Sequence, residues 1–287
     1  MTHRIVLIAG IGHSGSTLLD MALGCHPRIV GLGEVSKVLR TPLDELRGTR
    51  YRQGMCSCGA VARGCPFWST LLDWLEDNPT LSLEQKYTRV LEHFRQTYGP
   101  DTLLLDSSKT VRPYQAWLNN QHELRAIHLT RDVRSWIDSR LRGNDPRDKG
   151  GTLRLSARWW RGNRRTERFL AHHRINTFNL GYEELATRPS AMLEKLCQWL
   201  ELDFDPAMLT PSSTGSHIIR GNAARQERSR VAAIRYDARW MTSSRLMLQS
   251  PLLLPLAARN RRLVYANTPD TAKTKQHITT DNQDKHS

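Results

Sequence analysis

Short apolar runs alternate along the chain with longer amphipathic stretches. The apolar runs of strand length are 4–9, 29–33, 102–106, 125–130 and 175–180. Apolar positions at helical spacing occupy 17–23, 67–76, 83–98, 113–121, the stretch from 131 to about 141, 156–172 and 189–200. Strands that alternate with helices in this way predict a three-layer α/β fold, in which a parallel sheet is covered by helices on both faces.

Three other segments lack this regularity. Residues 41–66 are polar and irregular, and residues 142–153 are rich in Gly, Asp and Lys, which predicts a mobile loop. The apolar stretch Leu246–Ala258 contains Pro251 and Pro255, which predicts a core or docking helix rather than a membrane span. No segment reaches the ~20 apolar residues that a transmembrane helix needs.

Composition narrows the possible partners and the cellular compartment. The 287 residues, 39% of them apolar, are enough for a sizeable core, and residues 267–287 are polar enough to predict a disordered tail. The net charge of +14 favours an anionic ligand, a nucleic acid or an acidic membrane face, and a solvated basic surface is the alternative. Five cysteines without a signal peptide predict a cytoplasmic protein.

The sequence IAGIGHSGSTLL, residues 8–19, joins the first strand to the first helix. Gly10, Gly15, Ser16 and Thr17 match the P-loop pattern G-x-x-x-x-G-K-[ST], with Ser16 in place of the lysine. The glycines let backbone N–H groups point inward, and the loop ends at the start of a helix. Both features favour phosphate binding over a plain turn. The predicted cofactor-binding residues of this loop are Gly12, His13, Ser14, Gly15, Ser16 and Thr17.

This loop resembles the 5′-phosphosulfate loop of the sulfotransferases that use 3′-phosphoadenosine 5′-phosphosulfate (PAPS). Family members often carry Lys or Arg where this chain has His13. A second stretch, with Arg131 after a strand and Ser139 in the following helix, is similar to the family's 3′-phosphate segment. A guanidinium and a hydroxyl suit a phosphate, although Arg131 could instead form a surface ion pair with Asp132 or Asp138.

A third stretch, residues 217–225, is similar to the Gly-Asn-x-x-Arg segment of bacterial sulfotransferases, which closes over the 3′-phosphate. The residues that would do so are Arg220, Gly221, Asn222 and Arg225. The three stretches occur in family order over about residues 4–265. The resemblance implies a single P-loop-like sulfotransferase domain over 1–266, which moves a sulfuryl group from PAPS to a hydroxyl-bearing acceptor and needs no metal.

The resemblance also implies three catalytic residues, Glu34, Lys109 and His13. In the protein-tyrosine sulfotransferases the catalytic base is a Glu at nearly the position of Glu34. Those enzymes have one residue fewer than this chain between the loop and that Glu. Glu34 could instead start the helix 35–39. Lys109 resembles the family's second lysine, which helps to neutralise the leaving phosphate. In this chain Lys109 and His13 would share that work. Asp106 is a weaker base candidate, and a structural role or one in orienting Lys109 is favoured.

Two further motifs carry weaker predictions. Cys56, Cys58 and Cys65 form three of the four ligands of a metal site, which Cys25 or His26 could complete, but a local disulfide or plain packing is favoured. The stretch 154–165 mixes arginines with tryptophans and could line an acceptor pocket, bind a polyanion or hold nucleic acid. The resemblance favours the acceptor side, so no nucleic-acid partner is expected.

Two other function classes stay open at this point. A P-loop kinase or NTPase with a degenerate loop would use Asp106 to hold magnesium, but Ser16 replaces the lysine that it needs. A basic nucleic-acid-binding protein would use the loop only structurally. The acceptor hydroxyl could belong to a carbohydrate, a lipid, a phenol or a tyrosine, with tyrosine and sugars slightly favoured. The oligomeric state is equally open.

Overall fold

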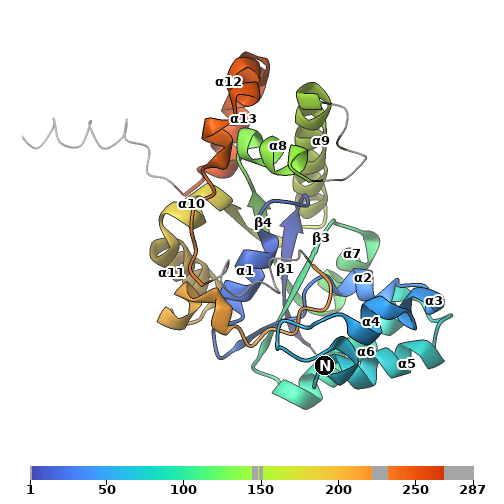
Figure 1. Cartoon of the computed structure of the whole chain (residues 1–287). Helices are drawn as coiled ribbons and strands as arrows, with labels where there is room; N and C mark the ends of the chain where they lie inside the picture. Colours follow the sequence, from blue (N-terminus) through green and yellow to red (C-terminus); the bar gives the residue numbers. More distant parts are fainter. Residues whose placement is uncertain (1, 144–147, 149–150, 222–231, 268–287) are drawn as a thin grey trace, which may run out of the picture.

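The computed structural model contains one sheet of five parallel strands in the order β2-β3-β1-β4-β5 (Figure 1). It describes residues 2–143, 148, 151–221 and 232–267. The strands are β1 Arg4–Gly10, β2 Ile29–Gly31, β3 Leu103–Lys109, β4 Glu123–Thr130 and β5 Asn176–Gly181. All five lie within a few residues of the runs that the hydrophobic pattern predicted, so the α/β fold with a parallel sheet is confirmed.

Helices cover both faces of this sheet. Alternate residues of β1 point to opposite sides: Ile5 and Leu7 join one buried cluster, and Val6 and Ile8 join another. The first cluster is completed by α2 Val35–Leu39, α5 Trp68–Asp77, α6 Leu83–Tyr98 and α7 Pro113–Gln121. The second is completed by α1 Ser16–Leu23, α10 Tyr182–Thr187 and α11 Pro189–Leu200. Figure 1 shows these two groups of helices on either side of the strands.

A third buried cluster lies beyond the carboxyl ends of the strands. It is built from α8 Val133–Leu141, α9 Gly151–His172, the 3₁₀ helix η8 Ser250–Leu256 and α13 Ala257–Val264. Trp136 and Trp159 are fully buried there. The remaining short elements are α3 Leu43–Leu46, α4 Thr49–Gln53, η1 Ala62–Gly64, η3 Pro206–Leu209, η4 Pro211–Ser213, η7 Arg239–Thr242 and α12 Ser244–Gln249.

The structure differs from the sequence predictions in two helical regions. Helix α9 begins at Gly151, five residues before the predicted start, because Leu155 and Trp159 lie one turn apart on the same buried face. The stretch Leu246–Ala258 is not one helix but runs through α12, η8 and the start of α13, since Pro251 and Pro255 interrupt α-helical hydrogen bonding. Within the described residues, no helix is long and apolar enough to cross a membrane.

The predicted irregular segments are partly structured. Residues 41–66 contain α3, α4 and η1, and only part of the predicted loop 142–153 lies within the described residues. The predicted tail 267–287 also lies outside them except for Asn267. The Asn267 backbone N–H donates to Glu184 at 2.7 Å, and its amide donates to the carbonyl of Asn179 at 2.9 Å. The ordered chain therefore extends to at least this residue.

Candidate active site

The parallel sheet brings the candidate residues together at one edge. The carboxyl ends of parallel strands meet at the same edge of a sheet, and ligands of such folds bind there. Gly10 ends β1, Lys109 ends β3, and Arg131 follows β4 directly. Glu34 comes three residues after β2, which pairs with β3. Strand order therefore sets these four groups beside one another although up to 121 positions separate them in sequence.

The loop between β1 and α1 has a backbone that requires glycine at two positions. Gly10 has a φ of 151°, and a Cβ there would lie 2.5 Å from the carbonyl oxygen of Leu129. Gly15 has a φ of 93°, and its Cβ would lie 2.7 Å from the ring of Tyr182. The loop leads into the amino end of α1, where backbone N–H groups have no partner within the helix. The buried Ser14 hydroxyl has no hydrogen-bond partner among the described residues.

Arg131 lies beside this loop and is held in place from several directions. Its Nη1 donates to the carbonyl of His13 at 3.3 Å and its Nε to the hydroxyl of Ser135 at 2.7 Å. Its Nη2 donates to Asp237 at 3.1 Å, and the guanidinium lies over the ring of Tyr182. The ion pairs considered from sequence are absent among the described contacts, because Asp132 and Asp138 pair with Arg134 and Arg142 instead.

His13 connects the loop to α8. Its Nδ1 lies 3.2 Å from the hydroxyl of Ser139, so the structure brings together the two residues that the resemblance assigned to different phosphates. Burial, followed by the nearby cations Arg140 and Lys109, lowers the pKa of His13 to about 4. The imidazole is therefore neutral near pH 7 in this state. A bound anion would offset the repulsion and raise that pKa.

Glu34 and Lys109 form a buried ion pair. The Lys109 Nζ lies 2.5 Å from Glu34 Oε1, and Lys37 pairs with the other carboxylate oxygen. The Glu34 side chain is 3% exposed and that of Lys109 14%. Glu34 does occupy the position before α2, but its side chain does not cap the helix. Burial by itself would raise the pKa of Glu34, yet Lys109 and Lys37 outweigh it and hold the pKa below its ordinary value. Glu34 is therefore an ionised carboxylate.

A cavity of about 520 Å³ joins the loop to Lys109 and Arg131. Its walls on the loop side are His13, Gly15, Ser16, Thr17 and Leu18, and on the strand-end side Lys109, Arg131, Ser139 and Tyr182. Residues from the C-terminal part of the chain close the third side, namely Ala233, Arg235, Tyr236, Asp237 and Arg239. A concave, cation-lined space at a phosphate-type loop can hold a phosphorylated nucleotide.

The remaining predicted residues lie around this cavity or outside the described chain. Arg220 pairs with Glu45 at 3.3 Å, and its backbone carbonyl accepts the N–H of Glu34. Gly221 lies beside Thr17, since a Cβ on it would be 3.7 Å from the Thr17 hydroxyl. Asn222 and Arg225 belong to the residues that the structure does not describe.

Asp106 lies below the site in the core. Its carboxylate accepts hydrogen bonds from the backbone and hydroxyl of Ser108 and from the hydroxyl of Tyr87, the last at 2.9 Å. Burial raises its pKa to about 6. No hydrogen bond or ion pair between Asp106 and Lys109 occurs among the described contacts, so the structural role considered from sequence is supported and the orienting role is not. Tyr87 and Ser108 also occupy the oxygens that a magnesium ion would need.

Several residues of the cavity were missed in the sequence, and Asp237 and Tyr182 are the two that contact Arg131. Asp237 pairs with Arg131 from 106 residues away, and hydrogen bonds from Arg239 and then Arg131 lower the pKa of the Asp237 carboxyl. Nothing in the sequence near Asp237 indicates this contact. Tyr182, in contrast, follows the end of β5, so the rule that ligands bind at strand ends could have identified it.

Helix α9, which contains the mixed arginines and tryptophans, contacts both Arg131 and the loop. The indole N–H of Trp159 donates to the carbonyl of Arg131 at 2.9 Å, and Gly162 lies against Ile11 of the loop. Since Trp159 is fully buried, it is not available as a surface platform for nucleic-acid bases. Trp160 is only partly buried, under the guanidinium of Arg164.

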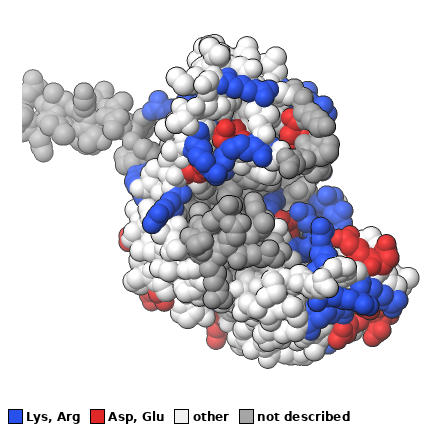
Figure 2. Space-filling view, in the orientation of Figure 1, with Lys and Arg blue, Asp and Glu red and all other residues white. Residues whose placement is uncertain are grey.

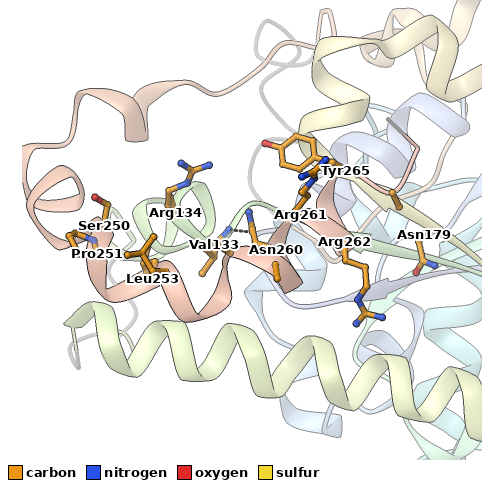
Figure 3. Close-up of a pocket in the computed structure, with 14 residues that line it drawn as sticks. Val133, Arg134, Asn179, Ser250, Pro251, Leu253, Asn260, Arg261, Arg262 and Tyr265 are labelled. Atoms are coloured by element: carbon orange, nitrogen blue, oxygen red, sulfur yellow. Dashed lines mark hydrogen bonds between the residues drawn. The ribbon is translucent and has the colours of Figure 1, made fainter. Parts of the chain in front are cut away.

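A larger cavity, of about 1550 Å³, lies between the start of α8 and residues of the segment 250–266 (Figure 3). Figure 3 shows Pro251 and Leu253 at one end of it and Arg261 and Tyr265 at the other. Asn260 accepts the backbone N–H of Val133 at 2.9 Å between them. None of the predicted site residues lines this cavity, so its size does not identify it as the nucleotide site.

The basic residues are unevenly distributed on the surface. Figure 2 shows Lys and Arg gathered over the upper part of this face, where Figure 1 places α8, with a few acidic residues next to them. On the right, over α3 to α5, the two signs alternate. The lower left of the same face is largely uncharged, so the basic residues of this face are concentrated rather than spread evenly.

Comparisons with known proteins identify the family of this chain. The sulfotransferase family model matches residues 6–206. A sulfotransferase domain from the curacin biosynthetic pathway has a similar fold, with a TM-score of 0.52 and 20% identity over 88% of this chain and 98% of that one. A sulfotransferase domain of the Synechococcus PCC 7002 olefin synthase gives a TM-score of 0.47 and 20% identity over 94% of this chain and 95% of that one. A search of curated proteins found no match. With the family model matching more than half of its residues, the chain belongs to the sulfotransferase family.

Proposed function

We propose that this sulfotransferase transfers the sulfuryl group of PAPS to a hydroxyl group of its acceptor, with residues 1–266 acting as one domain. The observation that carries this proposal is the shared cavity, in which a phosphate-type loop without a P-loop lysine faces Arg131, His13 and Lys109. Lys109 in turn contacts the buried carboxylate of Glu34. A transfer reaction needs both an anion-binding region and a base, and these residues supply the two next to each other.

Each part of the nucleotide has residues suited to it. The loop 12–17 offers backbone N–H groups and the unpartnered Ser14 hydroxyl to the 5′-phosphosulfate. Arg131 and Ser139 offer a guanidinium and a hydroxyl to the 3′-phosphate. Gly221 lies close enough to Thr17 for Arg220 and Gly221 to bound the nucleotide from the other side. Asn222 and Arg225, which the resemblance assigns to the same role, lie outside the described residues.

Glu34 is the proposed base. Its carboxylate accepts the proton of the acceptor hydroxyl while the acceptor oxygen forms its bond to sulfur and the bond from sulfur to the bridging phosphate oxygen breaks. Lys109 contacts Glu34 and also lines the nucleotide cavity, so it can neutralise the negative charge that develops on the leaving phosphate. His13 assists as a second hydrogen-bond donor, since a bound anion favours its protonated form.

The kinase-like alternative finds less support in the geometry. A kinase needs a carboxylate free to hold magnesium. Asp106, the candidate for that role, is buried and hydrogen-bonded to Tyr87 and Ser108. The acceptor hydroxyl is proposed to belong to a carbohydrate, a lipid or a tyrosine, and the Glu-based resemblance favours tyrosine and sugars.

Thermal unfolding with nucleotides tests the proposal without an acceptor. The ligands are 3′-phosphoadenosine 5′-phosphate (PAP), ADP, and ATP with magnesium. A ligand that binds only the folded state at 100 times its dissociation constant adds ~2.7 kcal/mol to the free energy of unfolding. We expect PAP to raise the unfolding temperature more than ADP does. A shift with ATP and magnesium but none with PAP would contradict the proposal and favour the kinase-like function.

A further inference from the structure

Three cysteines and one histidine converge at a place that the proposed reaction does not use. The side chains are those of Cys56, Cys58, Cys65 and His217, and their ligand atoms all lie within 4.8 Å of one another. The Cys65 Sγ is 3.6 Å from Cys56 Sγ, 3.9 Å from Cys58 Sγ and 3.3 Å from the Nδ1 of His217. All three cysteines are free thiols in the structure.

These distances match the edges of a small tetrahedron. Zinc binds sulfur at about 2.3 Å and imidazole nitrogen at about 2.0–2.1 Å, which places two sulfur ligands about 3.8 Å apart. Three thiolates with one imidazole are a donor set that zinc prefers to magnesium or calcium. Four protein ligands also leave no open coordination position, which is typical of structural rather than catalytic zinc. We propose that Cys56, Cys58, Cys65 and His217 together bind one structural Zn²⁺ ion.

The backbone holds the four ligands in place from separate parts of the chain. Cys56 and Cys58 lie in a tight turn closed by the Cys56 N–H to the Ala60 carbonyl at 2.8 Å. The Ser57 hydroxyl donates to the Ser216 carbonyl at 2.5 Å and accepts the Ile218 N–H at 2.8 Å, which ties this turn to the segment on either side of His217. Cys65, by contrast, follows η1 directly.

The imidazole of His217 is also fixed by its surroundings. The Trp68 indole N–H donates to the His217 carbonyl at 2.6 Å, and the His217 ring stacks on Phe67 at 6.0 Å between centroids. His217 is 8% exposed and Cys65 is fully buried, so little water competes for the ligand atoms. The cysteines alone looked one ligand short because His217 lies 152 positions from Cys65.

The fourth ligand is therefore not one of the two residues considered from sequence. The Cys25 thiol donates to the carbonyls of Met21 and Thr210, and the His26 ring lies 3.0 Å from the Asp203 carbonyl oxygen. Neither belongs to the cluster of four.

A metal here would act on the active site through the chain that follows His217. Three residues later, the Arg220 carbonyl accepts the N–H of the proposed base Glu34 at 3.1 Å. The next residue, Gly221, lies beside Thr17 of the phosphate-type loop. By fixing His217 to the turn 56–58, the ion would hold this segment against Glu34. Its role is thus to position the segment, and it takes no part in sulfuryl transfer.

The direct test is metal analysis of the full-length protein. We expect about one zinc per chain to remain after gel filtration, and we expect Cys58→Ser to lower that content to well under half. Cys25→Ser is the matched control, because Cys25 is also a partly exposed free thiol but lies outside the cluster; it should keep the zinc. Wild-type protein without zinc, with iron in its place, or with a disulfide among the three cysteines would overturn the proposal, as would equal zinc in Cys58→Ser.

Cobalt substitution keeps the test independent of whether a variant folds. Wild-type protein is stripped with a chelator and titrated with Co²⁺. Tetrahedral sulfur coordination gives intense d–d bands in the red and a thiolate-to-metal charge-transfer band in the near ultraviolet, and both should saturate at about one equivalent and disappear when Zn²⁺ is added. Weak bands of octahedral cobalt alone would overturn the assignment.

Discussion

The substitution Arg131→Met isolates the proposed contact with the 3′-phosphate. Methionine keeps an unbranched side chain of similar length but removes the guanidinium. Arg131 is 6% exposed and directs separate N–H groups to His13, Ser135 and Asp237, so its position is fixed before any ligand binds. A preorganised cation loses little side-chain freedom on binding, so most of its attraction for the phosphate contributes to affinity.

The expected loss of binding free energy follows from the strength of hydrogen bonds to charged groups, which is about 1.5–3 kcal/mol each. Removing one such contact should weaken PAP binding about 10- to 150-fold, since 1.4 kcal/mol corresponds to a factor of ten. ADP lacks the 3′-phosphate, so its affinity should change much less. The quantity to compare is therefore the ratio of the PAP and ADP dissociation constants.

Isothermal titration calorimetry of both ligands with both proteins gives this ratio. Any general loosening of the fold caused by unpairing Asp237 affects PAP and ADP alike and cancels in the ratio. The control is Arg134→Met, the same substitution three residues on, where the side chain pairs with Asp132 and lies outside the nucleotide cavity. A ratio that is the same in wild type and Arg131→Met would refute the assignment of Arg131 to the 3′-phosphate.

Two further predictions concern charged groups at or near the strand ends. Lys109→Met should lower turnover about 10²- to 10³-fold, as losing one transition-state donor does, and PAP affinity by a much smaller factor; equal losses in both would indicate a binding role only. The same variant removes a cation that lowers the pKa of Glu34, so the acid limb of the pH–rate profile should move to higher pH. Burial raises the pKa of Asp20 to about 7 from 3.8, so the folded state binds the carboxyl proton more tightly than the unfolded state does, and stability from this group falls as pH rises from about 4 to about 7. Asp20→Asn removes that dependence. The free energy of unfolding of the variant relative to wild type, measured by chemical denaturation, should therefore be higher at pH 8 than at pH 4 by up to about 4 kcal/mol. A difference that does not change with pH would show that Asp20 has an ordinary pKa.

The hydrophobic pattern was sufficient to predict the sheet, and the resemblance to the family supplied most of the candidate site residues. Gly10, Lys109 and Arg131 lie at the ends of apolar runs that became β1, β3 and β4, and a parallel sheet places such ends together whatever the chain does in between. The sheet was thus predicted from short-range patterns, and this general rule of topology explains why the candidate residues come together. The start of α9 was misplaced because Gly and Asp residues before it resemble a loop, although Leu155 already belongs to the helix's buried face.

Contacts made by the C-terminal part of the chain could not be predicted in the same way. Asp237 and His217 come after α11, in segments with few regular elements, so no periodic pattern indicates what they face. The sequence therefore suggested only the nearby Asp132 or Asp138 as partners of Arg131, and Cys25 or His26 as the fourth ligand of the cysteines. Only tertiary packing brings these side chains together, over separations of 106 and 152 residues.

The role of Glu34 as the base is the central claim about the reaction, and Glu34→Gln tests it most directly. Glutamine keeps the shape and an oxygen for Lys109 but cannot take the acceptor's proton. Transfer of labelled sulfuryl groups from PAPS to a hydroxyl acceptor identified with the wild type gives turnover, and calorimetry with PAP gives binding in parallel. We predict a 10²- to 10⁴-fold lower turnover, the usual contribution of a general base, with PAP affinity within a few-fold of wild type. Turnover equal to wild type in the glutamine variant would contradict the mechanism.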